Sequence, residues 1–528
     1  MKSIYTLIFL ALSVCVFALN ITYRLEAQSK TPSDAFNTFA MGNFEDYHQY
    51  MMIIKLGTEG KLLYHNAYSE ESIPDVLLQP FYTVIGIISR PFHLSLYDIY
   101  FYARLSSLGI LFFSVYLLII AVFQKTITRS LATVVYFSTT GLWTVLSQQP
   151  FIIQKQPLGY ANFDIYLKYL VIPPHHNIAI ALLIFIMLLA SKPFNSKSTV
   201  LMMILTVLLF IIHPYIAYML LLSFYVHAGI QIIRTKTFHT VETKQAVAIT
   251  ISALPMIGYY IYLYSQVLRM SIGSAGILTY LPRAETFVGY IHSLGPAFFL
   301  ALPVLVLPNS YKQPHIRLLL IWAFLPILLF FLPDLHVPFN TWRLFQIYQH
   351  IPLSLLAVYS VVLFIGKKPY YLAVAIVVSV ASLLYGGTSL IWTYSDVFAD
   401  PKYFSMNRYI PDREIAIYNY LNSKTPEHSV VIAGTYVSNV IPSFTHNHVV
   451  IGHNGDNRNF IEKQKDIGQF LGQNIPGEKL YDFLKKYNAS YIIFGVDAPK
   501  FADTIYATLP FLKEVYEFEG LSVVQFIE

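Results

Sequence analysis

Residues 102–123 read YARLSSLGILFFSVYLLIIAVF, an apolar run whose only charged residue is Arg104. A helix needs roughly 20 such residues to cross the hydrocarbon layer of a bilayer. The fold class that follows is an α-helical polytopic membrane protein with about eleven transmembrane helices. The predicted helices cover residues 4–20, 102–123, 130–147, 178–191, 199–212, 216–233, 245–264, 286–307, 318–332, 346–365 and 371–392.

The composition of the 528-residue chain agrees with a membrane environment. Apolar residues make up 55% and charged residues 12%, with a mean hydropathy of +0.53, whereas soluble domains carry about 25% charge. The net charge of +6 is spread along the chain without a dense basic tract, so no nucleic-acid partner is expected. The single cysteine, Cys15, excludes an intramolecular disulfide.

Basic residues in the loops predict the orientation of the helices. Five short alternate loops hold more Lys and Arg than the opposite short loops do, and such loops face the cytoplasm. Their basic residues are Lys125, Arg129, Lys192, Lys197, Arg234, Lys236, Lys244, Lys312, Arg317, Lys367 and Lys368. An odd number of crossings then places the N-terminus in the cytoplasm and residues 393–528 outside the plasma membrane. Residues 4–19 are expected to stay as a helix rather than leave as a signal peptide, because no good cleavage site follows.

Two parts of the chain are expected to lie outside the bilayer. Residues 21–101 form a long first external loop, in which 76–89 is expected to be a helix lying in the membrane interface. Residues 393–528 lack long apolar runs and alternate helical with β-rich patterns, which predicts a C-terminal extracytoplasmic α/β domain. The predicted domains are therefore 1–392, a transmembrane domain that includes the first external loop, and 393–528.

Within the C-terminal domain the pattern predicts separate helices and strands. The helices are expected near 412–423, 457–471 and 476–487, and the strands near 429–433, 448–451, 489–494 and 521–527. Residues 453–457, His-Asn-Gly-Asp-Asn, are interpreted only as a turn, because Asn-Gly favours positive φ.

The first external loop holds the candidate catalytic residues. Residues 44–48, Phe-Glu-Asp-Tyr-His, place two carboxylates and a histidine near the outer membrane surface, ahead of a helix-like run to Leu56. A carboxylate that is partly screened from water can bind a metal or act as a general base. The alternative is a solvated loop in which Glu45 and Asp46 simply favour the start of a helix.

A resemblance gives these residues a role. A short first helix, a large external loop with an acidic motif, LQPF at 78–81 and ARLSS at 103–107 follow one another in an order similar to the GT-C superfamily of membrane glycosyltransferases. That superfamily includes protein mannosyltransferases and bacterial lipid-A and arabinose transferases. The resemblance covers the general layout of the chain, and close motif similarity covers about residues 40–110.

In the resembled family an acidic residue of the first loop sits at the active site, often as the base for the acceptor. The resemblance therefore implies Asp46 as the catalytic base and Glu45 as the second choice, with His48 beside them for substrate. The family often has one residue between two acidic residues, whereas Glu45 and Asp46 are adjacent here. The metal ligands therefore stay unassigned.

Two histidines close the external loop 148–177, which also contains Asp164. Proline stiffens the approach to His175 and His176, and histidines at a helix start could bind phosphate or reach a sugar. The alternative is that they cap a membrane helix at the interface. Asp164, His175 and His176 are predicted to bind substrate.

Arg343 is the predicted phosphate-binding residue. It lies in the external loop 334–343, and an arginine fork suits phosphate oxygens. Other GT-C proteins use basic residues near this part of the chain to hold the lipid phosphate. The alternative is an arginine that snorkels to the lipid headgroups.

The resemblance implies an inverting hexosyl- or pentosyltransferase of the cell envelope. It would move a sugar from a polyprenyl-phosphate donor to an acceptor glycan, lipid or protein at the outer face of the bilayer. Asp46 would deprotonate the acceptor, and Arg343 with His175 or His176 would stabilise the leaving phosphate. A divalent metal ion could share that task, and no other cofactor is expected. A transporter or flippase of lipid-linked sugars and a non-catalytic membrane scaffold are the alternatives.

Overall fold

The structure of the protein is a computed structural model. It describes residues 2–40, 44–141, 169–170, 172–266, 290–291, 294–307, 311–329, 348–365, 368–399, 409–472, 475–496 and 498–527. The chain divides into two compact units, each made of three separate stretches of sequence. The first unit consists of residues 1–23, 103–258 and 281–400, and the second of residues 24–102, 259–280 and 401–528. The predicted domains, 1–392 and 393–528, stay a prediction.

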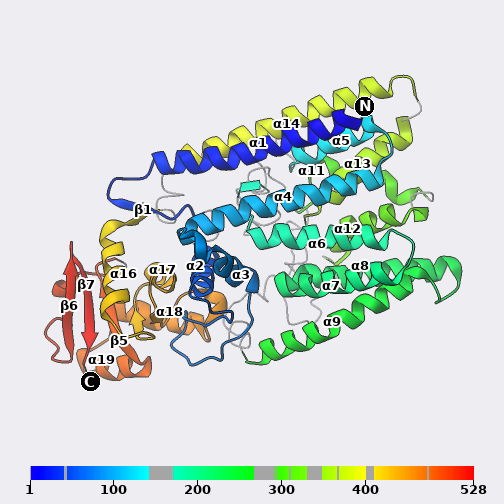
Figure 1. The fold of residues 1–528 in the computed structure, drawn as a ribbon. Helices are drawn as coiled ribbons and strands as arrows, with labels where there is room; N and C mark the ends of the chain where they lie inside the picture. The colour runs from blue at the N-terminus through cyan, green and yellow to red at the C-terminus, as the bar shows by residue number, and fades with distance from the viewer. Residues whose placement is uncertain are drawn as a thin grey trace. The chain divides into compact units, whose positions relative to one another are not determined.

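The first unit is built from helices whose axes are roughly aligned with one another (Figure 1). Each of the eleven predicted segments contains a helix. These elements, some of which continue into the second unit, are α1 (Lys2–Ser29), α4 (Leu96–Val122), α5 (Thr126–Ser138), α6 (Pro174–Ala190), α7 (Ser196–Ile212), α8 (Pro214–Thr235), α9 (Val241–Gln266), α11 (Gly295–Ala301), η5 (Leu302–Val306), α12 (Pro314–Leu329), α13 (His350–Ile365) and α14 (Tyr371–Ala399).

Length and apolar composition qualify five of the described helices as candidate membrane spans. These are found in α1, α4, α8, α9 and α14. Another five apolar helices among the described residues are shorter than 18 residues. The protein is therefore mostly helical and rich in membrane-compatible helices, while the number of about eleven crossings and their orientation stay predictions.

A buried ion pair lies within the first unit. Arg317 of α12 is 1% exposed, and its Nη2 donates to the Glu242 carboxylate at 2.8 Å. Its Nη1 donates to the Tyr311 carbonyl at 2.7 Å and its Nε to His227 Nδ1 at 3.2 Å. A buried charge is tolerated only when it is paired in this way. The helix α12 begins at Pro314, four residues earlier than predicted, and this pairing explains how it can include an arginine.

The second unit combines parts of the first external loop with the C-terminal part of the chain. From the first loop come β1 (Ala35–Asn37), α2 (Phe44–Thr58), α3 (Pro80–Ser89) and η1 (Arg90–Phe92). From the C-terminal part come β2 (Tyr409–Pro411), α16 (Asp412–Lys424), β3 (Val430–Ile432), α17 (Thr435–Phe444), β4 (His448–Val449), η8 (Asn454–Asp456), α18 (Phe460–Leu471), α19 (Gly477–Lys486), β5 (Ala489–Phe494), η9 (Phe501–Asp503), β6 (Leu512–Phe518) and β7 (Leu521–Phe526).

A mixed five-stranded sheet lies at the centre of the C-terminal part, in the order β4-β3-β5-β7-β6 (Figure 1). Strand β3 pairs in parallel with β4 and β5, and β7 pairs antiparallel with β5 and β6. Successive strand residues point to opposite faces, so Val431 joins one apolar core while Val430 and Ile432 join another. The first core also contains residues of α2, α16 and α17, and the second contains residues of α18 and α19.

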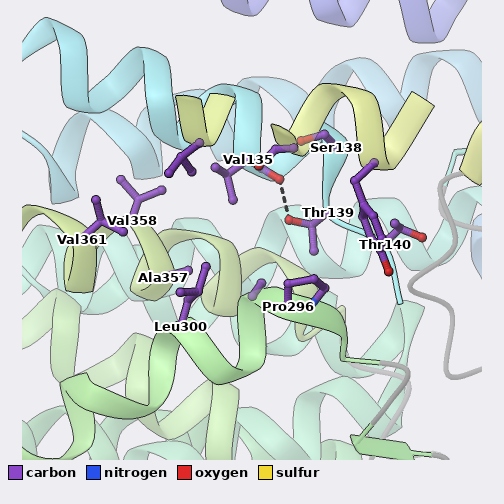
Figure 2. Close-up of a pocket in the computed structure, with 13 residues that line it drawn as sticks. Val135, Ser138, Thr139, Thr140, Pro296, Leu300, Ala357, Val358 and Val361 are labelled. Atoms are coloured by element: carbon purple, nitrogen blue, oxygen red, sulfur yellow. Dashed lines mark hydrogen bonds between the residues drawn. The ribbon is translucent and has the colours of Figure 1, made fainter. Parts of the chain in front are cut away.

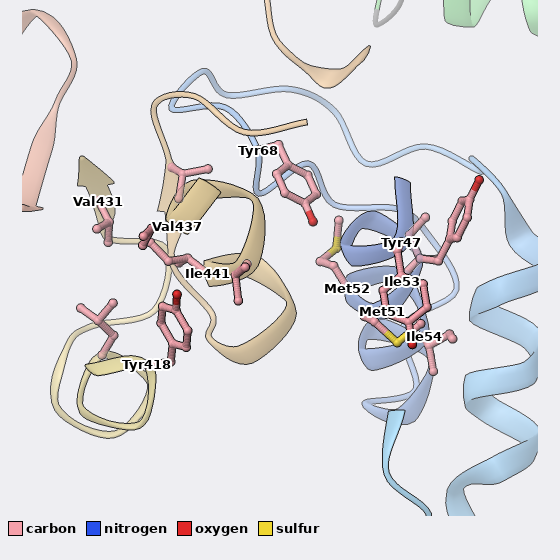
Figure 3. Close-up of a cluster of buried hydrophobic side chains, with 14 of the residues drawn as sticks. Tyr47, Met51, Met52, Ile53, Ile54, Tyr68, Tyr418, Val431, Val437 and Ile441 are labelled. Carbon is pink, nitrogen blue, oxygen red and sulfur yellow. The ribbon is translucent and has the colours of Figure 1, made fainter. Parts of the chain in front are cut away.

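Helix α2 is fixed by the first of these cores (Figure 3). Met51, Ile53 and Ile54 are fully buried and pack with residues of α16 and α17. Against α3 the contact is between backbones, because a Cβ on Gly57 would lie 2.2 Å from the Thr83 carbonyl oxygen. A Cβ on Gly86 would lie 2.3 Å from the Ile54 carbonyl oxygen. Glycine at both positions is what allows α2 and α3 to approach so closely.

Two short strands that lie far apart in the sequence pair with each other in this unit. Strand β1 pairs antiparallel with β2, with Ala35 opposite Pro411 and Asn37 opposite Tyr409. The backbone N–H of Asp412 also donates to the Asp34 carbonyl at 2.8 Å. The first external loop is thus tied by main-chain hydrogen bonds to the segment that leads into the C-terminal sheet.

Candidate active site

The acidic pair lies in the first turn of α2, as the sequence indicated. Carboxylates at this position are stabilised by the helix dipole. Just before them, the Phe44 ring stacks on Tyr436 of α17 with 5.0 Å between centroids. Just after them, the Tyr47 hydroxyl donates to the Thr38 carbonyl at 2.6 Å. These contacts on both sides fix where Glu45 and Asp46 stand.

His453 bridges two carboxylates from distant parts of the sequence. Its Nε2 lies 3.0 Å from Asp46 Oδ1, and its Nδ1 lies 3.0 Å from Asp456 Oδ2. Burial alone would lower the pKa of His453, but the Asp456 and Asp46 carboxylates outweigh it and raise that pKa to about 10. At neutral pH both ring nitrogens therefore carry protons and donate to a carboxylate. His453 is therefore a largely buried cation placed between Asp46 and Asp456.

Side chains from α2 and from the loop after it hold the turn that carries His453. Gln49 Nε2 donates to the Asp456 carboxylate, and Asn66 Nδ2 donates to the Asp456 carbonyl at 2.8 Å. Asn457 Nδ2 donates to the Tyr68 carbonyl at 2.5 Å. A Cβ on Gly452 would lie 2.5 Å from the Tyr68 ring, so this ring packs directly against the backbone before the turn.

The site is negatively charged overall. Glu45, Asp46 and Asp456 place three carboxyl groups around the single His453 imidazolium. Burial raises the pKa of Glu45, and the neighbouring Asp46 raises it further. His453 and a hydrogen bond with the backbone of Asn454 act in the opposite direction and lower this pKa. The side chain of Asp46 is 35% exposed, against 6% for Asp456. Asp46 is therefore the more accessible of the two carboxylates that His453 bridges.

His453 and Asp456 are functional candidates that the sequence analysis did not identify. Residues 453–457 were interpreted only as a turn, and the turn exists as η8. The expected positive φ is not found at Asn454 or Gly455; Asn459 adopts φ 53° instead. The available signal was a histidine and an aspartate three positions apart on a tight turn, but their partner Asp46 lies 407 residues earlier.

His48 is oriented into the protein core. It is fully buried, and its Nδ1 lies 3.1 Å from Ser443 Oγ, whose hydroxyl donates to the Val440 carbonyl. Burial lowers the pKa of His48 to about 3, so this histidine is neutral. Its place between α2 and α17 is that of a packing and hydrogen-bonding residue, and a role in substrate binding stays a prediction.

The predicted histidine pair forms a group of three in the first unit. His175 and His176 lie in the first turn of α6, and His213 lies between α7 and α8. His213 Nε2 is 3.3 Å from His176 Nε2, and its Nδ1 accepts a hydrogen bond from the Ile216 N–H at 3.4 Å. Their nearest ring nitrogens lie within 4.8 Å of one another, a spacing that could hold a metal ion.

Asp164 and Arg343 lie outside the described residues. Their predicted roles in substrate and phosphate binding are neither supported nor opposed by the structure.

Metal-ligand geometry is found only in histidine groups within the described part of the chain. Two groups of three have ligand atoms within 4.8 Å of one another, namely His175, His176 and His213 in the first unit, and His65, His428 and His448 in the second. The acidic group around Asp46 is not among them. A divalent ion at Asp46 would therefore need ligands beyond those that the described residues bring together.

An apolar pocket lies inside the first unit (Figure 2). Its cavity volume is about 60 Å³, and it is lined mainly by Val, Ala, Leu and Pro residues of α5, α11, α13 and α14. The hydroxyls of Ser138, Thr139 and Tyr385 donate to backbone carbonyls. The lining contains no charged residue, so this pocket offers no group for acid–base chemistry.

Comparison with known proteins supports the fold. No protein-family model matches the sequence, and no curated protein matches it either. Among solved structures, the apo oligosaccharyltransferase of Archaeoglobus fulgidus is 14% identical with a TM-score of 0.50, over 93% of this chain and 69% of that one. The same enzyme tethered to an acceptor peptide containing the NVT sequon is 12% identical with a TM-score of 0.52, over 92% and 68%. This chain has a GT-C fold.

The GT-C fold confirms the resemblance that the order of motifs indicated. A further structure of the archaeal enzyme is a complex with Zn and sulfate, 14% identical with a TM-score of 0.50, over 92% of this chain and 67% of that one. At these identities the likeness concerns the fold. The catalytic assignment therefore depends on the residues of this chain, above all on the Asp46–His453–Asp456 group.

Proposed function

We propose that this protein is a glycosyltransferase that uses a lipid-phosphate-linked sugar donor at the outer face of the membrane. The observation that carries the proposal is the ion pair between Asp46 and His453, at the start of a helix in the first external loop of a GT-C fold. Asp46 is partly exposed and lies beside a cation, and the proposal assigns it the role of general base.

The reaction follows from this charge arrangement. Asp46 accepts the proton of the acceptor hydroxyl, the acceptor oxygen attacks the anomeric carbon, and the bond from that carbon to the lipid phosphate breaks. A single displacement inverts the anomeric centre. The His453 cation, itself held by Asp456, pairs with Asp46 and would favour its ionised form. His175, His176 and Arg343 are the proposed partners of the leaving phosphate, whose negative charge grows in the transition state.

The donor is proposed to be a polyprenyl-phosphate sugar carrying a hexose or pentose. The acceptor is a glycan, a lipid or a protein. One structure of the similar archaeal oligosaccharyltransferase contains a tethered acceptor peptide, so a peptide belongs among the acceptors to be tested. A divalent metal ion could assist the departure of the phosphate.

A transfer assay in membranes tests the proposal. Membranes containing the protein, given labelled polyprenyl-phosphate sugars and a panel of acceptors, should form a glycosidic bond, and Asp46→Asn should reduce the rate by about 100-fold or more. Asp412→Asn is the matched control, because Asp412 is an exposed acidic residue in the first turn of another helix, α16. It should transfer at the wild-type rate.

The alternatives predict other outcomes in the same membranes. A flippase would move the labelled lipid across the bilayer without forming a glycosidic bond. A scaffold would be unaffected by Asp46→Asn in any assay of its partner. If wild type and Asp46→Asn transfer sugar equally, Asp46 is not the base.

A further inference from the structure

A second histidine cluster lies in the second unit. It differs from the group around Asp46 in its residues and in their hydrogen bonds. It consists of His65, in the loop after α2, His428, before β3, and His448, the first residue of β4. His65 Nε2 lies 2.9 Å from His448 Nε2, and His428 Nδ1 lies 3.2 Å from the same His448 atom. Three imidazole nitrogens thus converge on one point.

Backbone structure brings the three histidines together. The N–H of His448 donates to the Ser429 carbonyl at 3.0 Å, and the N–H of His428 donates to the His446 carbonyl at 2.9 Å. The loop that carries His65 reaches the edge strand β4, where the Val449 N–H donates to the Ala67 carbonyl at 3.0 Å. His428 adopts φ 64°, a left-handed conformation in which few residues other than glycine are found.

The outer nitrogens of two of these rings have hydrogen-bond partners that fix the position of the proton. His448 Nδ1 lies 3.0 Å from the Ser69 carbonyl, which can only accept, so Nδ1 carries the hydrogen. His65 Nδ1 lies 2.8 Å from the Asp75 carboxylate and donates to it in the same way. The bridge between Tyr64 and Val76 sets His65 opposite Asp75. In the neutral rings, Nε2 of His448 and Nε2 of His65 then present lone pairs.

Two lone pairs only 2.9 Å apart repel each other unless a cation lies between them. A metal ion at this point would accept both lone pairs at once, together with the His428 nitrogen that lies 3.2 Å from His448 Nε2.

A tetrahedral zinc ion with Zn–N bonds of about 2.0–2.1 Å places its nitrogen ligands about 3.3 Å apart. The observed separations of 2.9 and 3.2 Å are close to this spacing. Carboxylate and carbonyl acceptors on the outer nitrogens are the usual second layer of a histidine zinc site.

We propose that His65, His428 and His448 bind a divalent transition-metal ion, with Zn²⁺ as the best match. Imidazole ligands suit zinc, and three protein ligands leave a fourth position for water. Because its ligands come from a first-loop segment and from the edge of the C-terminal sheet, the ion would clip that loop to strand β4 within the second unit. The site shares no residue with the group proposed for the transfer reaction.

Zinc titration tests this proposal. The full chain is purified in detergent, treated with a chelator and then titrated with zinc. Calorimetry should show one tight binding event that His448→Gln and His65→Ala weaken by at least about 100-fold. Asp75→Asn, which removes only the carboxylate behind His65, should weaken it by about 10–100-fold. X-ray absorption at the zinc edge should show three nitrogen ligands at about 2.0 Å.

Matched variants separate this site from other histidines. His446→Ala removes a half-buried histidine two residues from His448, near Glu59, and should leave zinc binding unchanged. His213→Ala and Asp46→Asn should also leave this event unchanged. Zinc should raise the Tm of the wild type and not that of His448→Gln, with equal Tm values for both without metal. The proposal is overturned if wild type and His448→Gln bind zinc equally, or if no tight event occurs.

Discussion

His453 supplies the positive charge beside the acidic pair in the proposed active site. Its two ring nitrogens contact Asp46 and Asp456, each at 3.0 Å. The folded-state pKa of about 10 lies above the usual 6.5. The stabilisation that His453 contributes is therefore fully present below about pH 6.5 and is lost as the pH rises through 10. Over the physiological range, Asp46 keeps a cationic partner.

Removal of Asp456 should make the site sensitive to moderate alkalinity. Asp456→Asn removes one of the two carboxylates that raise the pKa of His453. The lowering effect of burial is then less opposed, so this pKa should fall by about 1–3 pH units. The alkaline limb of the transfer rate should move down from about pH 10 by a similar amount. The measurement is the rate of sugar transfer between pH 6 and 11, with Tm against pH as a second measurement if the variant is slow.

Asp482→Asn is the control for this profile, because Asp482 is exposed on α19 and has no part in the group. Its profile should match the wild type. An alkaline limb at the same pH in Asp456→Asn and wild type would show that Asp456 does not set the charge of His453.

At the residue scale, local patterns predicted one half of the candidate site. The position of Glu45 and Asp46 at a helix start could be predicted, because helix starts favour acidic residues. The partner His453 could not, because a pairing across 407 residues leaves no periodic signal in a single sequence. The convergence of His65, His428 and His448 was missed for the same reason.

At the scale of elements, the contact between α2 and α3 controls where Asp46 stands. These helices meet through Gly57 and Gly86, each of which faces a carbonyl oxygen of the other helix. Backbone cannot move aside as the end of a flexible side chain can. Any added atom at this contact must therefore displace α2, the helix that carries Asp46.

Gly57→Ala should destabilise the protein by about 1–3 kcal/mol through overpacking and should also slow sugar transfer. The matched control is Gly229→Ala in α8, where an added Cβ meets nothing within 4 Å. There alanine should be neutral or stabilising by up to about 1 kcal/mol, since it is the better helix former. Thermal unfolding in detergent compares the two, and equal stability would contradict a tight α2–α3 contact.

Apolar periodicity predicted most helices and strands. It failed where tertiary contacts determine whether an element forms or where it begins and ends. The helix α4 begins at Leu96 rather than near 102, because Ser95 and Asp98 cap its first turn reciprocally. The helix α1 continues to Ser29 rather than ending near 20, past the polar residues at which hydropathy suggested an end. Strand β6 and helix α17 were not predicted. Only Leu512 of β6 is buried and the strand pairs with β7, while α17 contains Pro442.

At the scale of the whole molecule, the membrane topology is the main prediction still to be tested. Loop charges place Lys197 in the cytoplasm and the C-terminal part of the chain outside. With Cys15→Ser as background, Glu478→Cys should react with a membrane-impermeant maleimide on intact cells, whereas Lys197→Cys should react only after lysis. Both replaced side chains are exposed, so accessibility is matched. Labelling of Lys197→Cys in intact cells would reverse the orientation.

The sequence predicted the helical membrane class and a C-terminal α/β region, but the composition of the two compact units could not be predicted. Residues 24–102 cluster with residues 401–528 through contacts such as the β1–β2 pair, which joins Ala35 to Pro411. Three-residue strands are too short to stand out in a single sequence.

The β1–β2 pair has a consequence for how the protein is made. Its second strand leaves the ribosome more than 370 residues after its first, and His453 follows later still. Until then the ion pair between Asp46 and His453 cannot form, and α2 lacks the α17 side of its core. A chain released by the ribosome before residue 453 would therefore lack half of the proposed active site.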